Sequence, residues 1–403
     1  MQKKLLILGA SFSYIGSIIA AKEMGLKVLV TDRNPKAPGL KYADLPLSID
    51  IIDIEGCLEA AKKYNIDGII AVNDFGVMTA AHVAEAMQLP GIPVDIAKIC
   101  TNKYLMRKTW ETAGLPSIKF RRVSNFEEAQ AAVNDLGFPL IIKPCDSRGG
   151  GSRGVQYIDE NSDLDSVFSF ANGFYKDNDL IIEEFVTGLE HSSEVIITEG
   201  KPHIIAISDK VKSTLPFRVD DTIIYPTIET GKRLEQIEWA IKESIKAIGI
   251  RDGVAHVELS MTDSGPVLFE IGARCGGGAP APLVPYLTGV QQFQEAARIA
   301  VGEKPIFTKP LYNKGCVIKF YYPEPGIVRE ISGIEQVEGV KGVLSFALFA
   351  EIGSLIKSLR TCSDRAGMVI TGAETREEAL SIANEIINLV EIKTTPINEN
   401  ELV

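Results

Sequence analysis

Two acids and one arginine in the stretch Val254–Pro280 are of types that suit metal and phosphate chemistry. They are Glu258, Glu270 and Arg274. Two β-prone runs flank a short segment of turn composition, which predicts a β-hairpin. If a three-residue loop closes this hairpin, Glu258 and Glu270 lie directly opposite each other, and Arg274 lies on the same face as Glu270.

Two carboxylates placed opposite each other destabilise a sheet, so this hairpin needs a compensating charge. A divalent cation between Glu258 and Glu270 is the obvious candidate, because Mg²⁺ typically binds one or two carboxylates together with substrate phosphates. Arg274 could then receive an anion bidentately beside the metal. The alternative is a surface hairpin with two solvated carboxylates, and this stretch alone does not decide between the two.

Two lysines and a glycine-rich stretch earlier in the chain favour the functional interpretation. Lys103 lies in the first turn of a predicted helix, Thr101–Gly114, where the helix dipole disfavours a cation. Lys143 interrupts the apolar strand Phe138–Pro144, so it should face a cleft and a negative partner. The following loop, Ser147–Val155, has the sequence SRGGGSRGV, whose backbone N–H groups suit phosphate. It lacks the P-loop pattern GxxxxGK[ST], and for Lys103 a solvated side chain is the alternative.

Bulk properties exclude several functional classes. The chain has 403 residues, 45% hydrophobic and 24% charged, which is ordinary for a soluble protein of two or three domains. Its net charge of −11 argues against a nucleic-acid or anionic-membrane partner. No apolar stretch is long enough for a transmembrane helix. The six cysteines are scattered without a CxxC pair, which indicates reduced thiols in the cytoplasm and no zinc site.

The elements that must position these residues form three predicted domains. Residues 1–115 begin with the strand Lys4–Leu8, the helix Tyr14–Met24 and the strand Leu26–Thr31, which predicts a doubly wound β-α-β domain with a parallel sheet. Glycines at the first turn and Asp32 are typical of a dinucleotide fold, but the GxGxxG spacing is not met. We expect Asp32 to cap a loop rather than to contact a ribose. Residues 116–305 hold the lysine strand and the hairpin, and residues 306–403 form an α+β domain.

The order of these features resembles the ATP-grasp superfamily over nearly the whole chain. The shared features are a βαβ pre-domain, a lysine-bearing helix, a strand lysine with a glycine-rich loop, a Glu-Glu-Phe-Val hinge at 183–186, and a hairpin with two acids and an arginine. Within the superfamily the chain looks most like carboxylate–amine ligases, especially the L-amino-acid ligases (dipeptide synthetases). The turn GARCGGG at 272–278 carries this narrower resemblance. The implied fold is ATP-grasp, α/β and α+β, with a lid at about 116–190 and a C-terminal domain that closes one side of the substrate cleft.

The resemblance implies roles for individual residues. The lysines would hold the ATP phosphates, the loop would cover them, the hinge would bind adenine, Glu190 would contact the ribose, and Lys210 would reach toward the γ-phosphate. The implied ATP-binding residues are Lys103, Lys143, Ser147, Gly149, Gly150, Gly151, Ser152, Glu183, Glu184, Phe185, Val186, Glu190 and Lys210. The implied Mg²⁺ ligands, with Mn²⁺ as an alternative ion, are Glu258 and Glu270. The implied catalytic residues are Arg274, Glu270 and Lys143, and the implied substrate contacts are Arg274, Gly276 and Gly277. The chain departs from the family pattern at Gly272, where many members carry Asn.

The implied function is an ATP- and Mg²⁺-dependent ligase that converts a carboxylate into an acyl phosphate and joins it to an amine. Small-molecule acids and amines would be its partners, and a homodimer is expected by analogy. His256 and Asp209 are candidates for a general base, and Arg365 could contact a carboxylate or lie on the surface. The alternatives are a bicarbonate-using, carboxyphosphate-forming enzyme, a nicotinamide-dependent oxidoreductase and a non-catalytic ATP-binding protein.

Overall fold

The first apolar run of the chain lies at the centre of a parallel sheet. The computed structural model describes residues 2–146, 150–174, 179–277, 280–306, 310–311 and 313–396. The strands of the first sheet lie in the order β3 (Leu45–Leu47), β2 (Lys27–Thr31), β1 (Lys4–Leu8) and β4 (Gly68–Ala71), and all of them are parallel. The helices of this unit are α1 (Ile15–Glu23), α2 (Ile54–Tyr64) and α3 (Asp74–Met87).

Side chains of β1 are buried on both faces of this sheet, as its continuous apolar sequence predicts. Leu5 and Ile7 pack with α1, while Leu6 and Leu8 pack with residues of α2 and α3. The first face is completed by Ala297 of α10 (Gln292–Ala300), a helix that returns from much later in the chain. The predicted doubly wound domain is therefore confirmed in its parallel sheet and two helical layers, and a distant helix supplies part of one layer.

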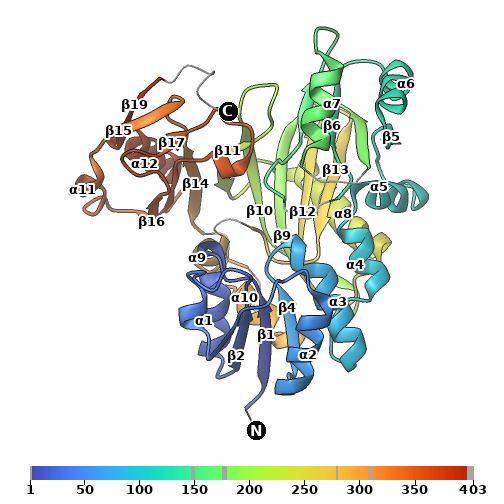
Figure 1. Ribbon diagram of the computed structural model, residues 1–403, viewed down its shortest axis with the longest axis vertical. Coiled ribbons are helices and arrows are strands. Elements are labelled where there is room, and N and C mark those ends of the chain that lie inside the picture. The colour runs from blue at the N-terminus through green and yellow to red at the C-terminus, as the bar shows by residue number, and fades with distance from the viewer. Residues whose placement is uncertain are drawn as a thin grey trace.

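A second, smaller sheet carries Lys143 and the hinge. Two helices, α4 (Val94–Cys100) and α5 (Lys103–Thr112), lead into it. Its antiparallel strands lie in the order β5 (Phe120–Val123), β8 (Leu180–Glu184), β6 (Leu140–Pro144) and β7 (Gln156–Ile158). The helices α6 (Phe126–Leu136) and α7 (Leu164–Asn172) pack on it through an apolar cluster. In Figure 1 this unit forms the upper right lobe.

The third sheet is the largest and continues from the predicted middle domain into the predicted C-terminal domain. Its antiparallel strands lie in the order β13 (Gly265–Gly272), β12 (Gly253–Thr262), β9 (Leu189–Thr198), β10 (Lys201–Lys212), β11 (Asp220–Tyr225), β14 (Gly315–Tyr321), β18 (Gly367–Ala373) and β16 (Val343–Leu348). The helix α8 (Gly231–Ile248) packs on the end that carries the hairpin. The strand β10 continues past Lys210 and ends at Lys212.

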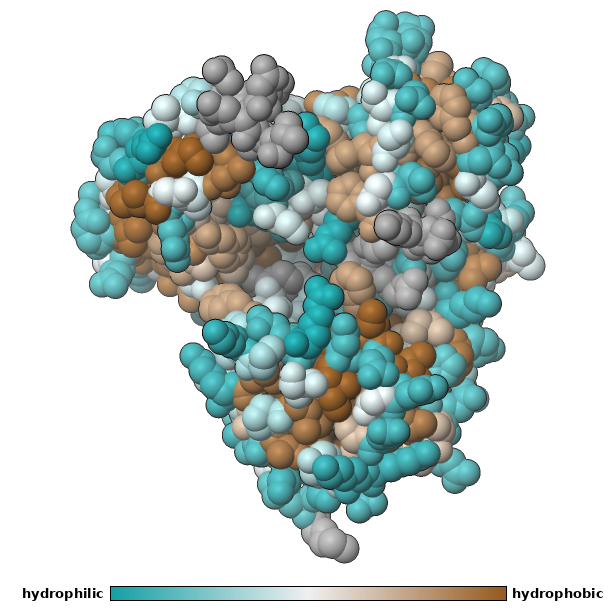
Figure 2. Space-filling model, viewed as in Figure 1, coloured by the Kyte–Doolittle hydropathy of each residue, from teal (hydrophilic) through white to brown (hydrophobic). Residues whose placement is uncertain are grey.

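The C-terminal end of this sheet builds the upper left lobe in Figure 1. The helix α12 (Arg376–Leu389) packs there on β14 and β18. A small sheet of β17 (Leu355–Ile356), β15 (Gly326–Ser332) and β19 (Glu391–Thr395) completes the lobe, with the short helix α11 (Ile334–Val337). The helix α9 (Pro280–Thr288) lies between this lobe and the N-terminal unit. The three lobes surround a hollow, which is visible near the centre of Figure 2.

None of the helices in the described part of the chain has both the length and the apolar character needed to cross a membrane.

Candidate active site

The predicted ATP-site residues that the structure describes converge on one cavity of about 180 Å³. One wall of the cavity is formed by β6 and β8 of the small sheet, which carry Lys143 and Glu183. The opposite wall is formed by the β12–β13 hairpin of the large sheet. The predicted residues that line it are Lys103, Lys143, Gly150, Gly151, Ser152, Glu183, Glu184, Phe185, Val186, Glu190, Lys210, Glu258, Glu270 and Arg274. Ser147 and Gly149 lie outside the described residues.

A second cavity, of about 570 Å³, adjoins the first and is partly lined by residues of the N-terminal unit. The two share Lys210, Glu258 and Arg274 in their linings. Gly277 lines the second cavity. Gly276 lines neither; its N–H donates to Glu194 Oε2 at 2.9 Å. A Cβ at position 276 would lie 2.1 Å from Glu194 Oε1, so a glycine is required there by packing.

The hairpin brings Glu258 and Glu270 into register, as predicted, but by a different route. Asp263 and Ser264 form a two-residue loop between β12 and β13, rather than the expected three-residue loop. A β-bulge between the Glu258–Glu270 and Leu259–Leu268 pairs leaves Phe269 as the extra residue and restores the alignment. The two acids therefore lie opposite each other on the strands.

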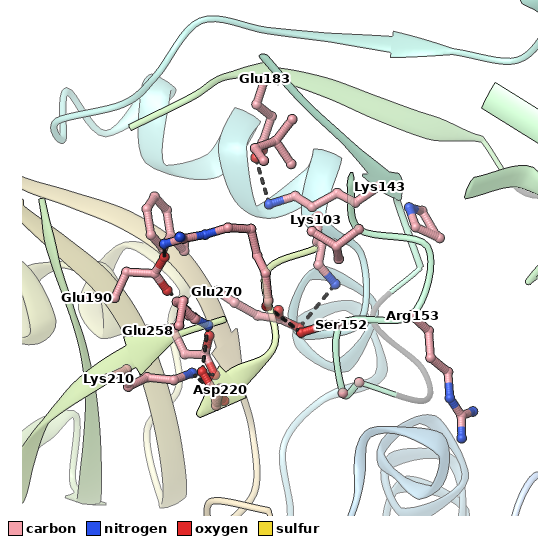
Figure 3. Close-up of a pocket in the computed structure, with 18 of the residues that line it drawn as sticks. Lys103, Lys143, Ser152, Arg153, Glu183, Glu190, Lys210, Asp220, Glu258 and Glu270 are labelled. Carbon is pink, nitrogen blue, oxygen red and sulfur yellow. Dashed lines mark hydrogen bonds and ion pairs between the residues drawn. The ribbon is translucent and has the colours of Figure 1, made fainter. Parts of the chain in front are cut away.

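Lysines compensate the charges of the facing acids in this structure. Lys103 Nζ lies 3.3 Å from Glu270 Oε1, and Lys210 Nζ lies 2.9 Å from Glu258 Oε1 (Figure 3). Burial raises the pKa of Glu258, but the charges of Lys210 and His256 outweigh it and hold the pKa well below its usual value. Burial likewise lowers the pKa of Lys103, and the Glu270 charge outweighs it and raises that pKa. Glu258 and Lys103 are thus charged. A bound polyanion could replace the acids as the partner of the lysines, while a cation replaces the lysines as the partner of the acids.

The start of α5 places Lys103 at the cavity. Asn102 is the N-cap, and its side chain accepts a hydrogen bond from the N–H of Leu105 at 3.1 Å. The N–H of Lys103 donates to Cys145 O at 2.7 Å, which ties the helix to the end of the Lys143 strand. A cation at a helix N-terminus is electrostatically unfavourable. Here the positive charge of the buried Lys103 is compensated by the carboxylate of Glu270.

Lys143 faces the cavity and has a negative partner, as its position in an apolar strand predicts. Its Nζ lies 2.6 Å from Glu183 Oε2 on the neighbouring strand β8, and both side chains are buried (Figure 3). Arg107, which is fully buried, contacts the other oxygen of Glu183, with Nε 2.8 Å from Oε1. Sequence reasoning missed Arg107, although a cation four positions after Lys103 on the same helix lies on the same face.

The glycine-rich loop is attached to two connecting segments, one between β10 and β11 and one between β17 and β18. Ser152 Oγ donates to Arg218 O at 2.8 Å, and the N–H of Cys362 donates to Gly151 O at 2.9 Å. Cys362 comes from the predicted C-terminal domain. The loop therefore lies over the cavity with contacts to the middle and the C-terminal parts of the chain.

An ion-pair network on β10 and β11 was missed at the sequence level. Lys212 lies 3.0 Å from Glu190 and 2.6 Å from Asp220, and Lys210 also contacts Asp220 at 3.3 Å. Arg218 donates to Glu190 Oε1 at 2.7 Å. Burial raises the pKa of Asp220, but Lys210 and Lys212 outweigh it and lower the pKa to about 2. The i, i+2 spacing of Lys210 and Lys212 in β10 is the sequence signal for this network, because it places both side chains on one face of the strand.

Neither candidate for a general base is free in this structure. Glu194 Oε1 lies 2.7 Å from His256 Nδ1, and Glu258 Oε1 lies 3.3 Å from Nε2. Burial lowers the pKa of His256, but Glu194 and then Glu258 outweigh it and raise the pKa to about 9, so the imidazole is a cation at neutral pH. Asp209 lines neither cavity and is paired with Arg376 at 2.7 Å.

Arg365 and Asp32 both line the second cavity. Arg365 lines the second cavity, so it is not a solvated surface residue; its Nη2 donates to Asp220 O at 2.8 Å and its guanidinium lies 3.5 Å from the Phe320 ring centroid. Asp32 caps a loop, as expected, by accepting hydrogen bonds from the N–H groups of Ala10 and Asn34.

Thiol labelling offers a direct test of this cavity. Cys362 lines both cavities and is the one half-buried cysteine of six, since the others are buried. We expect a neutral alkylating reagent to label Cys362 several-fold faster than Cys57, Cys100 or Cys316 in the native protein, with sites read by mass spectrometry. Mg-ATP should slow this labelling and leave the labelling after denaturation unchanged. Faster labelling of any buried cysteine, or no protection by Mg-ATP, would contradict the assignment.

Comparisons with known proteins agree with this arrangement. A family model described as "ATP-grasp domain" matches residues 136–281, and one described as "L-amino acid ligase C-terminal domain 2" matches residues 319–395. The chain is 25% identical to an L-arginine-specific L-amino acid ligase of Bacillus subtilis over 321 residues, which cover 76% of this chain and 75% of the relative. It is 26% identical to a formate-dependent phosphoribosylglycinamide formyltransferase of Nitratiruptor sp. over 398 residues, 95% of each chain.

A solved structure has the same fold over its whole length. The L-amino acid ligase from Bacillus licheniformis superposes with a TM-score of 0.84 at 22% sequence identity, and the match covers 98% of this chain and 99% of that one.

Proposed function

The chain belongs to the ATP-grasp superfamily and is related to its carboxylate–amine ligases, and on that premise we propose that it is an ADP-forming ligase that joins a small-molecule carboxylic acid to an amine. One observation carries the proposal: Glu258 and Glu270 face each other in a cavity that also holds Lys103, Lys143 and Arg274. Paired acids beside several cations suit a metal–nucleotide complex and leave a guanidinium for the substrate.

The donor set at the hairpin fits Mg²⁺. Glu258 and Glu270 offer carboxylate oxygens from adjacent strands, and both line the cavity beside the lysines. Mg²⁺ prefers oxygen ligands and usually keeps water ligands and substrate phosphates, so two protein carboxylates suffice. When bound, the ion would neutralise charge on the transferred phosphoryl group. The same donors would accept Mn²⁺.

The chain's own residues supply the rest of the chemistry. A substrate carboxylate oxygen attacks the γ-phosphorus of ATP, the bond to the β-phosphate breaks, and an acyl phosphate and ADP result. Lys103, Lys143 and Arg274 lower the repulsion between these anions and stabilise the charge that develops. The amine then attacks the acyl carbon, phosphate leaves, and the amine loses a proton. The glycine-rich loop at Gly150–Ser152 would exclude water, which otherwise hydrolyses the acyl phosphate.

Three kinds of acid substrate are compatible with this chemistry. The likeness to an amino acid ligase favours an amino acid, and the likeness over the full chain to a formate-dependent enzyme keeps a smaller acid as the alternative. A bicarbonate-using enzyme is the second alternative. The cavity that would hold the acid has both an apolar side, with Ile318 and Phe320, and cations at Arg274 and Arg365, which favours an organic carboxylate with an apolar part.

A phosphate-release screen over pairs of amino acids tests the proposal. We expect Mg²⁺-dependent release of ADP and phosphate that requires both an acid and an amine, with a condensed product visible by mass spectrometry. Release with bicarbonate and no organic acid would instead favour the carboxyphosphate alternative. Thermal stabilisation by NAD but not by Mg-ATP would overturn the ligase proposal, and stabilisation by Mg-ATP without turnover of any pair would leave a non-catalytic ATP-binding protein. Light scattering would check the expected homodimer.

A further inference from the structure

Asp74 binds the Arg274 guanidinium through both carboxylate oxygens, although the residues are 200 positions apart. Arg274 Nε donates to Oδ1 at 2.9 Å, and Nη2 donates to Oδ2 at 2.6 Å. Arginine–carboxylate pairs are strongest and most directional in this two-point geometry. The Arg274 and Asp74 side chains are only 13% and 6% exposed, so water competes little for either partner.

Both side chains start from fixed backbone positions. Asp74 is the first residue of α3, and the preceding Asn73 is the N-cap, whose side chain accepts a hydrogen bond from the N–H of Gly76 at 3.2 Å. The positive end of the helix dipole stabilises a carboxylate at this place. On the other side, Arg274 Nη1 donates to Cys275 O at 2.9 Å. The carboxylate is therefore held by a helix of the N-terminal unit, and the guanidinium is held from two directions.

Gly272 and Gly150 have no side chains, and this leaves room for the Asp74–Arg274 pair. A Cβ at Gly272 would lie 3.1 Å from Asp74 Oδ1 and 3.4 Å from Arg274 Cζ, so a side chain there would press on the pair. A Cβ at Gly150 would lie 3.6 Å from Asp74 Oδ2, which places the glycine-rich loop in contact with the carboxylate. Gly272 is also the position where the sequence departs from the Asn of the family pattern. The pair thus gives a steric reason for that departure.

The pair leaves part of the guanidinium available. A guanidinium has five N–H groups, and Arg274 uses three: two on Asp74 and one on the carbonyl of Cys275. One N–H remains on each Nη atom. Because Arg274 lines the same cavities as Glu258, these two groups are the ones that a substrate anion or acyl phosphate beside the metal ligands could use.

We infer, resting on the proposed ligase function, that Asp74 is a positioning residue for Arg274. It fixes the guanidinium before the substrate arrives, so that no side-chain ordering is needed when negative charge develops on the reacting group. The N-terminal unit thereby takes part in the active site through a residue that acts on another side chain. Gly272 at the hairpin end and Gly150 of the glycine-rich loop both lie beside this carboxylate.

Arginine-selective labelling tests the positional claim without any need for turnover. A dicarbonyl reagent, with sites read by mass spectrometry, should modify Arg274 several-fold faster in Asp74→Ala than in the unmodified protein. Arg121, whose side chain is 51% exposed, should be labelled in both proteins, and the fully buried Arg107 in neither. Equal labelling of Arg274 in the two proteins would overturn the inference.

A double-mutant cycle tests the functional claim. Asp74→Ala should lower kcat by about 10²-fold, the loss expected when a reacting group is misplaced by about 1 Å, with little change in the KM for ATP. Asp74→Asn, which keeps the shape and one oxygen acceptor, should lose less. In an Arg274→Lys background, Asp74→Ala should have almost no further effect, because residues that act as a unit are not additive. Equal losses in the two backgrounds would show that Asp74 does not act through Arg274.

Asp95→Ala is the matched control, since it also removes a carboxylate from the first turn of a helix but lies on the exposed side of α4. It should leave both kcat and the labelling of Arg274 unchanged. If the unmodified protein turns over no acid–amine pair, the proposed function fails, and the labelling contrast still decides whether Asp74 fixes Arg274.

Discussion

Replacing Glu270 with alanine is expected to abolish ligase turnover while the fold survives. Loss of a metal-ligating carboxylate removes several kcal/mol of charge stabilisation, which corresponds to a rate loss of at least about 10³-fold. The side chain of Glu270 is 24% exposed and belongs to the cavity wall rather than to the apolar core. ADP release in the presence of Mg²⁺, the acid and the amine is the measurement, with circular dichroism to check the fold.

The control for this variant lies in the same hairpin. Asp263→Ala removes an exposed carboxylate from the loop between β12 and β13 and should keep normal turnover. Mg²⁺ in the presence of ADP should raise the unfolding temperature of the unmodified protein and of Asp263→Ala, but not of Glu270→Ala. Near-normal turnover of Glu270→Ala would mean that the metal assignment is wrong.

The variant Arg107→Met is expected to be the most destabilising single change near the site. The Arg107 side chain is fully buried, contacts Glu183 at 2.8 Å and donates to the carbonyl of Phe269, the bulge residue, at 2.7 Å. Removing one partner of a buried ion pair costs about 3–5 kcal/mol, because the other charge stays buried. Lys143 alone would then have to compensate Glu183. Urea unfolding followed through the fluorescence of the neighbouring, buried Trp110 would measure the loss.

The adjacent residue provides a matched control for Arg107. Lys108 pairs with Glu111 on the same helix, but both side chains are about half exposed. Exposed pairs of this kind contribute little to stability, so Lys108→Met should have nearly the stability of the unmodified protein. A loss below about 1 kcal/mol in Arg107→Met would show that the buried pair is not a net stabilising contact.

The Arg107–Glu183 ion pair also makes the stability of the fold depend on pH. Burial raises the pKa of Glu183, but the charges of Arg107 and Lys143 outweigh it and hold the pKa below its ordinary value of 4.5. A carboxylate with a lower pKa in the folded state stabilises the fold above the unfolded-state pKa, and this contribution is lost as the pH falls through the folded-state value. Acid unfolding of Arg107→Met should therefore begin at a higher pH than that of the unmodified protein. Coincident acid transitions would contradict the prediction.

Local signals in the sequence were sufficient for the elements that present the site. The predicted helix Thr101–Gly114 put Lys103 in the first turn of α5, and a lone lysine in an apolar strand predicted that Lys143 faces a cleft. The alternation of strand residues predicted that Glu258 and Glu270 face each other. The loop length was wrong, and the pairing survived because a bulge at Phe269 added one residue where the shorter loop removed one.

The sequence by itself determined which residue types could meet a nucleotide and a metal, because caps, strand alternation and burial of apolar runs act over a few residues. Only the tertiary structure decided the partners of those residues. Arg274 meets Asp74 from 200 positions away, and Arg107 meets the carbonyl of Phe269 from 162 away. Such pairs depend on which helix start and which strand end are packed together, and no local periodicity encodes that choice. The charge state of each acid and lysine in the cavity follows from those partners.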